Sequence, residues 1–256
     1  MEKGRMKIAL AEAIGTFGLI FIGVLAVTGG LLAGADPGVV TITSVALAHG
    51  LIIFVLVAAL SAVSGGHFNP AITLGFVVTG RMPLSTAWVY WVSQLVGACV
   101  AAFLLVSTIG QVATATGTPA LAPGVSFGVG TVLEAVGTFF LVFVVFATAV
   151  DERAPRAVFP LAIGLTIAAD IMAFGLLTGG AVNPARAFGP ALASGAWENQ
   201  LVYWIGPLVG GALGGLVYHH GLMARAPTQP IAERGGPAPT EEREGPEEEE
   251  RRRRAA

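Results

Sequence analysis

The stretch SGGHFNPAIT, residues 64–73, interrupts a long apolar region, and its Asn-Pro-Ala triplet recurs in GGAVNPARAFGP, residues 179–190. Each asparagine suits a helix N-cap and each proline suits the first helical position, where its missing N–H costs nothing. After Asn69 about eleven residues remain before Arg81, which at ~1.5 Å per residue gives a helix of ~16 Å. That is half of the ~30 Å hydrocarbon core of a bilayer. We therefore expect each triplet to begin a half-helix inside a membrane.

The composition indicates an all-α, multi-pass membrane protein. The chain has 256 residues, of which 54% are hydrophobic and 12% charged, which is far from the balance of a soluble domain. Apolar runs of about 18 residues or more are long enough to cross a bilayer as helices. We count six such runs, at residues 8–32, 41–63, 84–109, 130–150, 157–178 and 201–223.

Charge placement predicts the orientation of these six spans. With six crossings, 13 of the 14 Lys and Arg residues fall on one side, and Arg186, beside the second triplet, is the exception. By the positive-inside rule we expect both termini to be cytoplasmic and the protein to lie in the cell membrane. Residues 224–256 are rich in Pro, Glu and Arg and are predicted to form a disordered tail after a channel domain of residues 1–223.

The sequence contains an internal repeat. The segment LAEAIGTFGLIFIGV, residues 10–24, matches VLEAVGTFFLVFVVF, residues 132–146, and pairs Glu12 with Glu134. We assign residues 7–110 to one copy and 128–223 to the other. Three spans per copy give the copies opposite orientations, an inverted repeat of the kind that builds transport sites near the bilayer midplane.

The repeat brings the N-termini of the two half-helices together at mid-depth. Each N-terminus carries roughly half a positive charge, so the pair is expected to repel cations. With the oxygens of Asn69 and Asn183 used in capping, we expect their amide NH2 groups to remain free to donate to water in a lumen.

The motifs SGGHFNPAITLG and NPARAFGPAL resemble the paired signatures of the aquaporin, or major intrinsic protein, family. The resemblance covers residues 7 to about 223. It implies six transmembrane helices with two re-entrant half-helices, one pore in each subunit and a homotetramer. It also implies that Glu12 and Glu134 brace the re-entrant loops, and that the pore is lined by the residues of the two triplets: Asn69, Pro70, Ala71, Asn183, Pro184 and Ala185.

Alignment to the family motif gives a selectivity filter of His49, Ile171, Gly180 and Arg186. Helix geometry places His49 ~12 Å and Ile171 ~10 Å below the outer ends of their spans, at a depth similar to that of Arg186. The set is similar to that of plant vacuolar-membrane aquaporins, which the family associates with ammonia as well as water. His67 is expected to line the inner pore, the alternative being a loop histidine bonded to backbone.

The function predicted from these features is passive passage of water, with ammonia and other small neutral solutes as further permeants. A glycerol facilitator is the alternative within the family, although Ala187 follows Arg186 where such channels usually have aspartate. Alternatives outside it are a secondary transporter and an adhesive junction protein. We expect no enzymatic activity, no cofactor or metal, and no nucleic-acid partner; the bilayer and other copies of the chain are the predicted partners.

Overall fold

A computed structural model describes residues 2–32 and 42–223 of the chain. The predicted tail, the segment between the first two predicted spans and the first residue of the second predicted span lie outside the described residues. The helices that the model describes are α1 (Glu2–Leu32), α2 (Ile42–Ser64), α3 (Pro70–Val78), α4 (Leu84–Ile109), α5 (Gln111–Gly117), α6 (Phe127–Val145), α7 (Phe159–Thr178), α8 (Pro184–Ser194) and α9 (Val202–Val217). One π-helical segment, η1 (Phe146–Val150), extends α6 and another, η2 (Tyr218–Leu222), extends α9.

The long helices correspond to the predicted membrane spans. Among the described residues, α1, α2, α4, α7 and α6 with η1 are each long and apolar enough to cross a membrane. The sixth crossing is α9, which has 16 residues and gains five more from η2. The predicted span at 84–109 has the same bounds as α4, whereas α1 begins six residues before the apolar run because its first turns carry charged residues.

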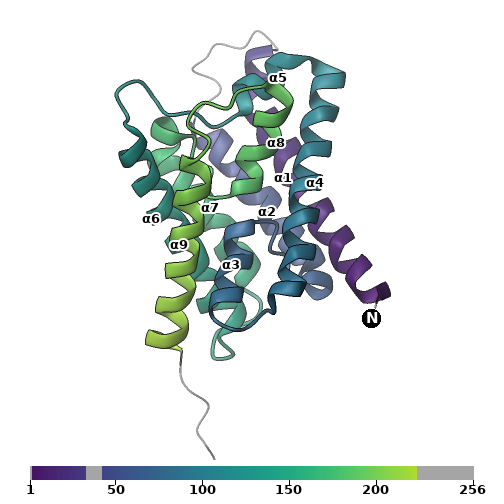
Figure 1. Ribbon diagram of the computed structural model, residues 1–256, viewed down its shortest axis with the longest axis vertical. Coiled ribbons are helices and arrows are strands. Elements are labelled where there is room, and N and C mark those ends of the chain that lie inside the picture. The colour runs from purple at the N-terminus through teal and green to yellow at the C-terminus, as the bar shows by residue number, and fades with distance from the viewer. Residues whose placement is uncertain (1, 33–41, 224–256) are drawn as a thin grey trace, which may run out of the picture. The chain divides into compact units, whose positions relative to one another are not determined.

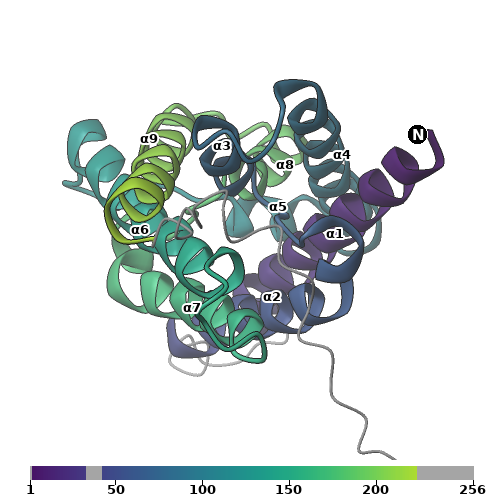
Figure 2. The ribbon, with the colours of Figure 1, turned by 90° about the horizontal axis from the view of Figure 1, so that it is seen from below.

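The helices of residues 2–223 form a ring closed by the two half-helices (Figure 2). Helix α1 packs against α2 and α4, α6 packs against α7 and α9, and α2 packs against α7 to join the two sets. Helices α3 and α8 fill the space between α4 and α9. In Figure 1 α8 occupies the upper half and α3 the lower half, so the two short helices enter from opposite faces.

Glycines allow close approach at three helix crossings, two of which are equivalent. A Cβ added at Gly97 would lie 2.2 Å from the Ala13 oxygen, and one at Gly210 would lie 2.0 Å from the Ala135 oxygen. These pairs join α4 to α1 and α9 to α6, the same crossing in each copy of the repeat. Small residues are typical of such contacts because they bring helix backbones together without a hydrophobic driving force.

The third crossing joins α2 to α7, where Gly50 faces Gly164. A Cβ at Gly50 would lie 2.5 Å from the Gly164 oxygen, and one at Gly164 would lie 2.4 Å from the Gly50 oxygen. The two glycines occupy the same position in the two copies of the repeat. The junction between the copies is therefore a contact between equivalent residues.

This close crossing predicts the effect of one added methyl group. We expect Gly164→Ala to reduce the free energy of unfolding by about 1–3 kcal/mol, because the neighbouring backbone must move to admit the side chain. Gly128→Ala, in α6, is the matched control, since nothing lies within 4 Å of its added Cβ. Thermal unfolding of the purified protein in detergent measures the stability of both variants. Equal unfolding midpoints for the two would contradict the close contact between α2 and α7.

Candidate functional site

The two half-helices begin with side-chain caps from the asparagines of the triplets. The Oδ1 atom of Asn69 accepts a hydrogen bond from the Ala71 amide at 2.9 Å. The Oδ1 atom of Asn183 accepts from the amides of Ala185 at 3.0 Å and Arg186 at 3.3 Å. The following proline is the first residue of each helix, so the local chemistry is that expected from the sequence.

The same asparagines also bind each other's loops. The Asn69 Nδ2 atom donates to the Val182 carbonyl at 2.8 Å, and the Asn183 Nδ2 atom donates to the Phe68 carbonyl at 2.9 Å. We expected the NH2 groups to remain free to donate to water, but one N–H of each is used here, because the left-handed loops turn these carbonyls toward the opposite asparagine. An amide NH2 has two hydrogens, so one N–H on each asparagine remains for a molecule in the lumen.

The residue before each asparagine has a left-handed backbone. Phe68 has φ 49° and Val182 has φ 42°, a region that costs a non-glycine residue about 1–3 kcal/mol. Such a conformation persists only where the surrounding structure holds it. Here a buried carboxylate supplies that hold in each copy of the repeat.

Glu12 binds the first loop with both carboxylate oxygens. Its Oε1 atom accepts from Ser64 Oγ at 2.6 Å and the His67 amide at 3.0 Å, and its Oε2 atom accepts from the Phe68 amide at 2.7 Å and Gln94 Nε2 at 2.8 Å. The side chain is fully buried. Four donors surround this one group, which is the arrangement that a buried, ionised carboxylate requires.

Glu134 binds the second loop in the same way. Its Oε1 atom accepts from Thr178 Oγ1 at 2.7 Å and the Ala181 amide at 2.9 Å, and its Oε2 atom accepts from the Val182 amide at 2.7 Å. This side chain is also fully buried. These contacts have the geometry that the expected bracing role requires at both glutamates.

Two tyrosines add a contact that the sequence analysis missed. Tyr90 donates its hydroxyl hydrogen to the Ser64 carbonyl, and Tyr203 donates to the Thr178 carbonyl at 2.8 Å. Both tie the end of a long helix to the loop that follows it. The signal was present, since the two tyrosines occupy corresponding places in the repeat.

Three cavities lie in series beside the asparagine pair. The middle one, the throat, offers about 20 Å³ to the centres of water molecules, room for roughly one or two. The outer cavity, near α5, offers about 380 Å³ and shares Ile171 and Arg186 with the throat. The basic-face cavity, near Arg81 and Arg156, offers about 480 Å³ and shares His67 and Ile163 with the throat.

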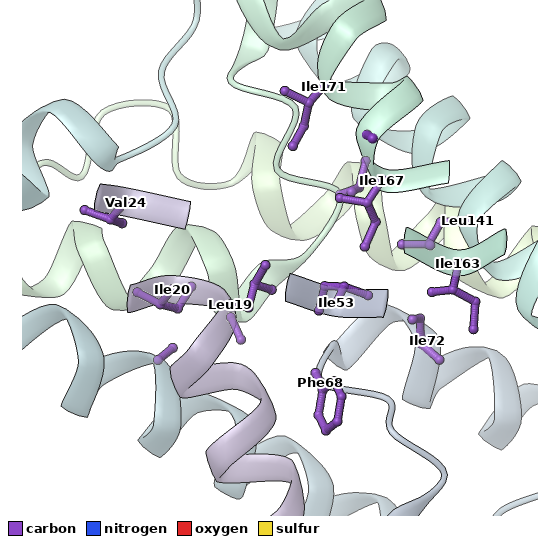
Figure 3. Packing of buried hydrophobic residues seen from close by; sticks show 14 of the residues in the cluster. Leu19, Ile20, Val24, Ile53, Phe68, Ile72, Leu141, Ile163, Ile167 and Ile171 are labelled. Atoms are coloured by element: carbon purple, nitrogen blue, oxygen red, sulfur yellow. The ribbon is translucent and has the colours of Figure 1, made fainter. Parts of the chain in front are cut away.

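The lining of the throat combines polar and apolar residues. Asn69, Asn183 and all four expected filter residues line it. The apolar residues that α1, α2, α3 and α7 contribute to the lining are Leu19, Ile53, Val57, Ile72, Ile163, Ile167 and Ile171. Figure 3 shows Ile163, Ile167 and Ile171 following one another along α7. A water molecule here meets a few hydrogen-bonding groups among many apolar side chains.

The sequence profile of the Major intrinsic protein family matches residues 2–218 of the chain. The chain belongs to the major intrinsic protein family. It is 44% identical over 235 residues to Aquaporin TIP4-4 of Zea mays, covering 90% of this chain and 92% of that protein. It is 40% identical over 231 residues to Aquaporin TIP2-1 of Arabidopsis thaliana, covering 89% and 92%.

A solved structure supports the fold assignment. The aquaglyceroporin from Plasmodium falciparum matches with a TM-score of 0.73 at 24% identity, covering 84% of this chain and 96% of that one. At that identity the likeness shows the fold alone. The family's fold, six helices with two re-entrant half-helices, is the fold that the sequence predicted.

In this family member Arg186 is buried and held by a helix that was not predicted. Its side chain is 5% exposed, and Nη1 donates to the Gly117 carbonyl at 3.0 Å. Gly117 ends α5, a short helix between the predicted spans at 84–109 and 130–150. The segment QVATATG has no apolar periodicity, and it packs against α1, α4 and α8. Tertiary contacts therefore explain a helix that the local sequence does not indicate.

His67 lies between two of the cavities. It lines both the throat and the basic-face cavity. Its ring Nδ1 atom lies 3.0 Å from Thr73 Oγ1, so the ring is bonded to a side chain, whereas the alternative reading expected a bond to backbone.

His49 is fixed by a carbonyl and by a glycine on α1. Its Nδ1 atom lies 2.8 Å from the Val45 oxygen, and since a carbonyl only accepts, Nδ1 must carry the hydrogen. A Cβ added at Gly23 would lie 2.4 Å from His49 Nε2. Gly23 thus provides the space that the imidazole occupies, a role that one glycine among many in an apolar helix does not reveal.

The Gly23 contact predicts a narrower throat in one variant. We expect Gly23→Ala to displace the His49 ring toward the throat and to lower water permeability several-fold, roughly 1 kcal/mol or more in activation free energy. Gly29→Ala, on the same helix, is the control because its added Cβ would meet nothing within 4 Å. Stopped-flow light scattering of proteoliposomes compares the two; unchanged permeability in Gly23→Ala would refute the positioning role.

Proposed function

We propose that this protein is a passive water channel that also conducts ammonia and other small neutral solutes. The observation that carries the proposal is the throat of about 20 Å³ between two larger cavities, lined by Asn69, Asn183 and Arg186. The aquaporins to which the chain is 40–44% identical support it. A cavity of this size holds roughly one or two water molecules and has no room for an ion with its hydration shell.

The polar groups of the throat would select neutral molecules. The free N–H of Asn69 and that of Asn183 can both donate to one water oxygen, which turns the hydrogens of that water away along the passage. A proton wire is interrupted there. The positive ends of α3 and α8 and the guanidinium of Arg186 oppose cations, because these charges lie in a low-dielectric interior.

We propose His49, Ile171, Gly180 and Arg186 as the selectivity filter and His67 as a residue of the inner pore. All five line the throat. Gly180 has φ 57°, and a Cβ there would lie 3.1 Å from Ile171 Cα. A larger residue at that position would have a strained backbone and would crowd Ile171, so only glycine fits at this point of the filter.

We also propose the membrane context expected from the sequence. Arg81 and Arg156 line the cavity of one face, which under the positive-inside rule is the cytoplasmic face of the cell membrane. Both termini would lie on that side. Homotetramer assembly is proposed from the family resemblance.

The filter proposal predicts the effect of filling the throat at His49. We expect wild-type proteoliposomes to shrink in stopped flow well above the rate of empty vesicles, without glycerol flux. His49→Phe should bring water and ammonia permeability close to that of empty vesicles, since the larger ring fills a cavity with room for roughly one or two waters. The control is Leu47→Phe, also on α2, where the side chain is 42% exposed at the outer surface.

Other results would point to other functions. Glycerol permeability well above that of empty vesicles would favour the glycerol facilitator. Saturable or ion-dependent flux would favour a secondary transporter, whose coupling ions need ligands near the midplane.

A further inference from the structure

The basic-face cavity combines a large volume with an unbalanced charge. It offers about 480 Å³, and its lining includes two arginines, Arg81 and Arg156, but no aspartate or glutamate. Arg81 follows α3 and Arg156 precedes α7, so two separate loops bring the charges to one cavity. The tendency of basic residues to lie on one membrane face explains the side on which they occur. It does not explain why both line the entrance to a pore.

Neither guanidinium has a carboxylate partner among the described residues. Arg81 donates from Nε to His219 Nδ1 at 3.4 Å and from Nη2 to the Met223 sulfur at 2.8 Å, and Arg156 donates from Nη1 to the Ala149 carbonyl at 3.4 Å. These acceptors are neutral. Both side chains therefore keep their full charge and unused donors.

The carboxylate of Asp151, which follows the cavity-lining residue Val150, is already paired with another arginine. Asp151 forms the only ion pair in the part of the chain that the structure describes, with Arg153, and it also accepts from the Tyr218 hydroxyl at 3.0 Å. Hydrogen bonds from Arg153 hold the pKa of Asp151 well below its usual range, so this carboxylate stays ionised and engaged. Arg153, unlike Arg81 and Arg156, does not line the cavity.

A helix end adds to the positive potential. Phe159, the first residue of α7, lines the same cavity, and the preceding residue, Val158, provides no side-chain cap. Helix α7 has 20 residues, and its first-turn N–H groups carry the partial positive charge of the helix dipole. The cavity thus presents two guanidinium forks and an uncapped helix end to one volume.

We propose that this cavity binds a phosphate-type oxyanion between Arg81 and Arg156, and that the bound anion obstructs the throat. Guanidinium groups bind phosphate through paired N–H donors. The ligand is a free phosphate or the headgroup of an acidic lipid. Because Gly66, His67, Ile72 and Ile163 line both this cavity and the throat, an occupant lies at the throat entrance. This second part, the control of flux, rests on the proposed water-channel function.

Binding is tested first, without reference to transport. Equilibrium dialysis of radiolabelled inorganic phosphate against the detergent-purified protein should show saturable binding. The double variant with Arg81→Gln and Arg156→Gln should lose it, whereas Arg5→Gln, which removes a charge outside this cavity, should retain it. Equal binding by the wild type and the double variant, or none by either, would overturn the site.

Flux is tested next, with the two sources of phosphate in separate arms. In phosphatidylcholine vesicles, inorganic phosphate on both sides should lower water permeability relative to chloride of equal ionic strength, by roughly half when half the sites are filled. In a second arm phosphatidic acid replaces part of the lipid and no free phosphate is present. The arm in which water permeability decreases identifies the source of the bound phosphate group. The double variant should show no decrease in either arm.

The outcomes separate this proposal from the proposed function. Wild-type protein that conducts water equally with chloride, phosphate and phosphatidic acid would refute obstruction while leaving the channel intact. Protein that binds phosphate but never conducts water would refute the channel and leave the site.

Discussion

The structure depends on two buried carboxylates that hold backbone amides in strained loops. Glu12 accepts from the amide of Phe68 and Glu134 from the amide of Val182, and both of these residues are left-handed. Without these hydrogen bonds, each loop would relax to an ordinary backbone conformation, which is about 1–3 kcal/mol lower in free energy. The carbonyls that follow these amides would then turn away from the opposite asparagine, and the ends of α3 and α8 would no longer be joined.

The carboxylates themselves are stable only because the loops surround them with donors. Burying an ionised carboxylate is costly in a membrane protein, and Glu12 has four donors and Glu134 three. The donors of the loops stabilise the buried carboxylates, and the carboxylates in turn hold the loops in their strained conformation. The inverted repeat supplies the same solution twice, and glycine pairs such as Gly50 with Gly164 bring the two copies close enough for their loops to meet.

Much of this arrangement could be predicted from local chemistry. Asn69 and Asn183 indicate where the half-helices begin, and the span lengths predict how deep in the bilayer the filter residues lie. The pairing of Glu12 with Glu134 identifies the repeat. The hydrogen bonds from each asparagine to the opposite loop could not be predicted, because Phe68 and Val182 are residue types that give no sign of a left-handed backbone. The other omissions depend on the packing of separate helices: α5 forms against its neighbours, and Gly23 matters only because α2 places His49 against it.

The most direct test is the Glu12→Gln variant, with Glu152→Gln, an exposed loop position, as the control. Glutamine replaces one acceptor oxygen by an NH2 donor that faces other donors, at roughly 1–3 kcal/mol for each buried group left unpaired. Thermal unfolding and stopped-flow water permeability, measured on the same preparations, should both fall sharply in Glu12→Gln and stay unchanged in Glu152→Gln. A Glu12→Gln protein with wild-type unfolding and wild-type permeability would show that the carboxylate does not hold the loop, and the account would be wrong.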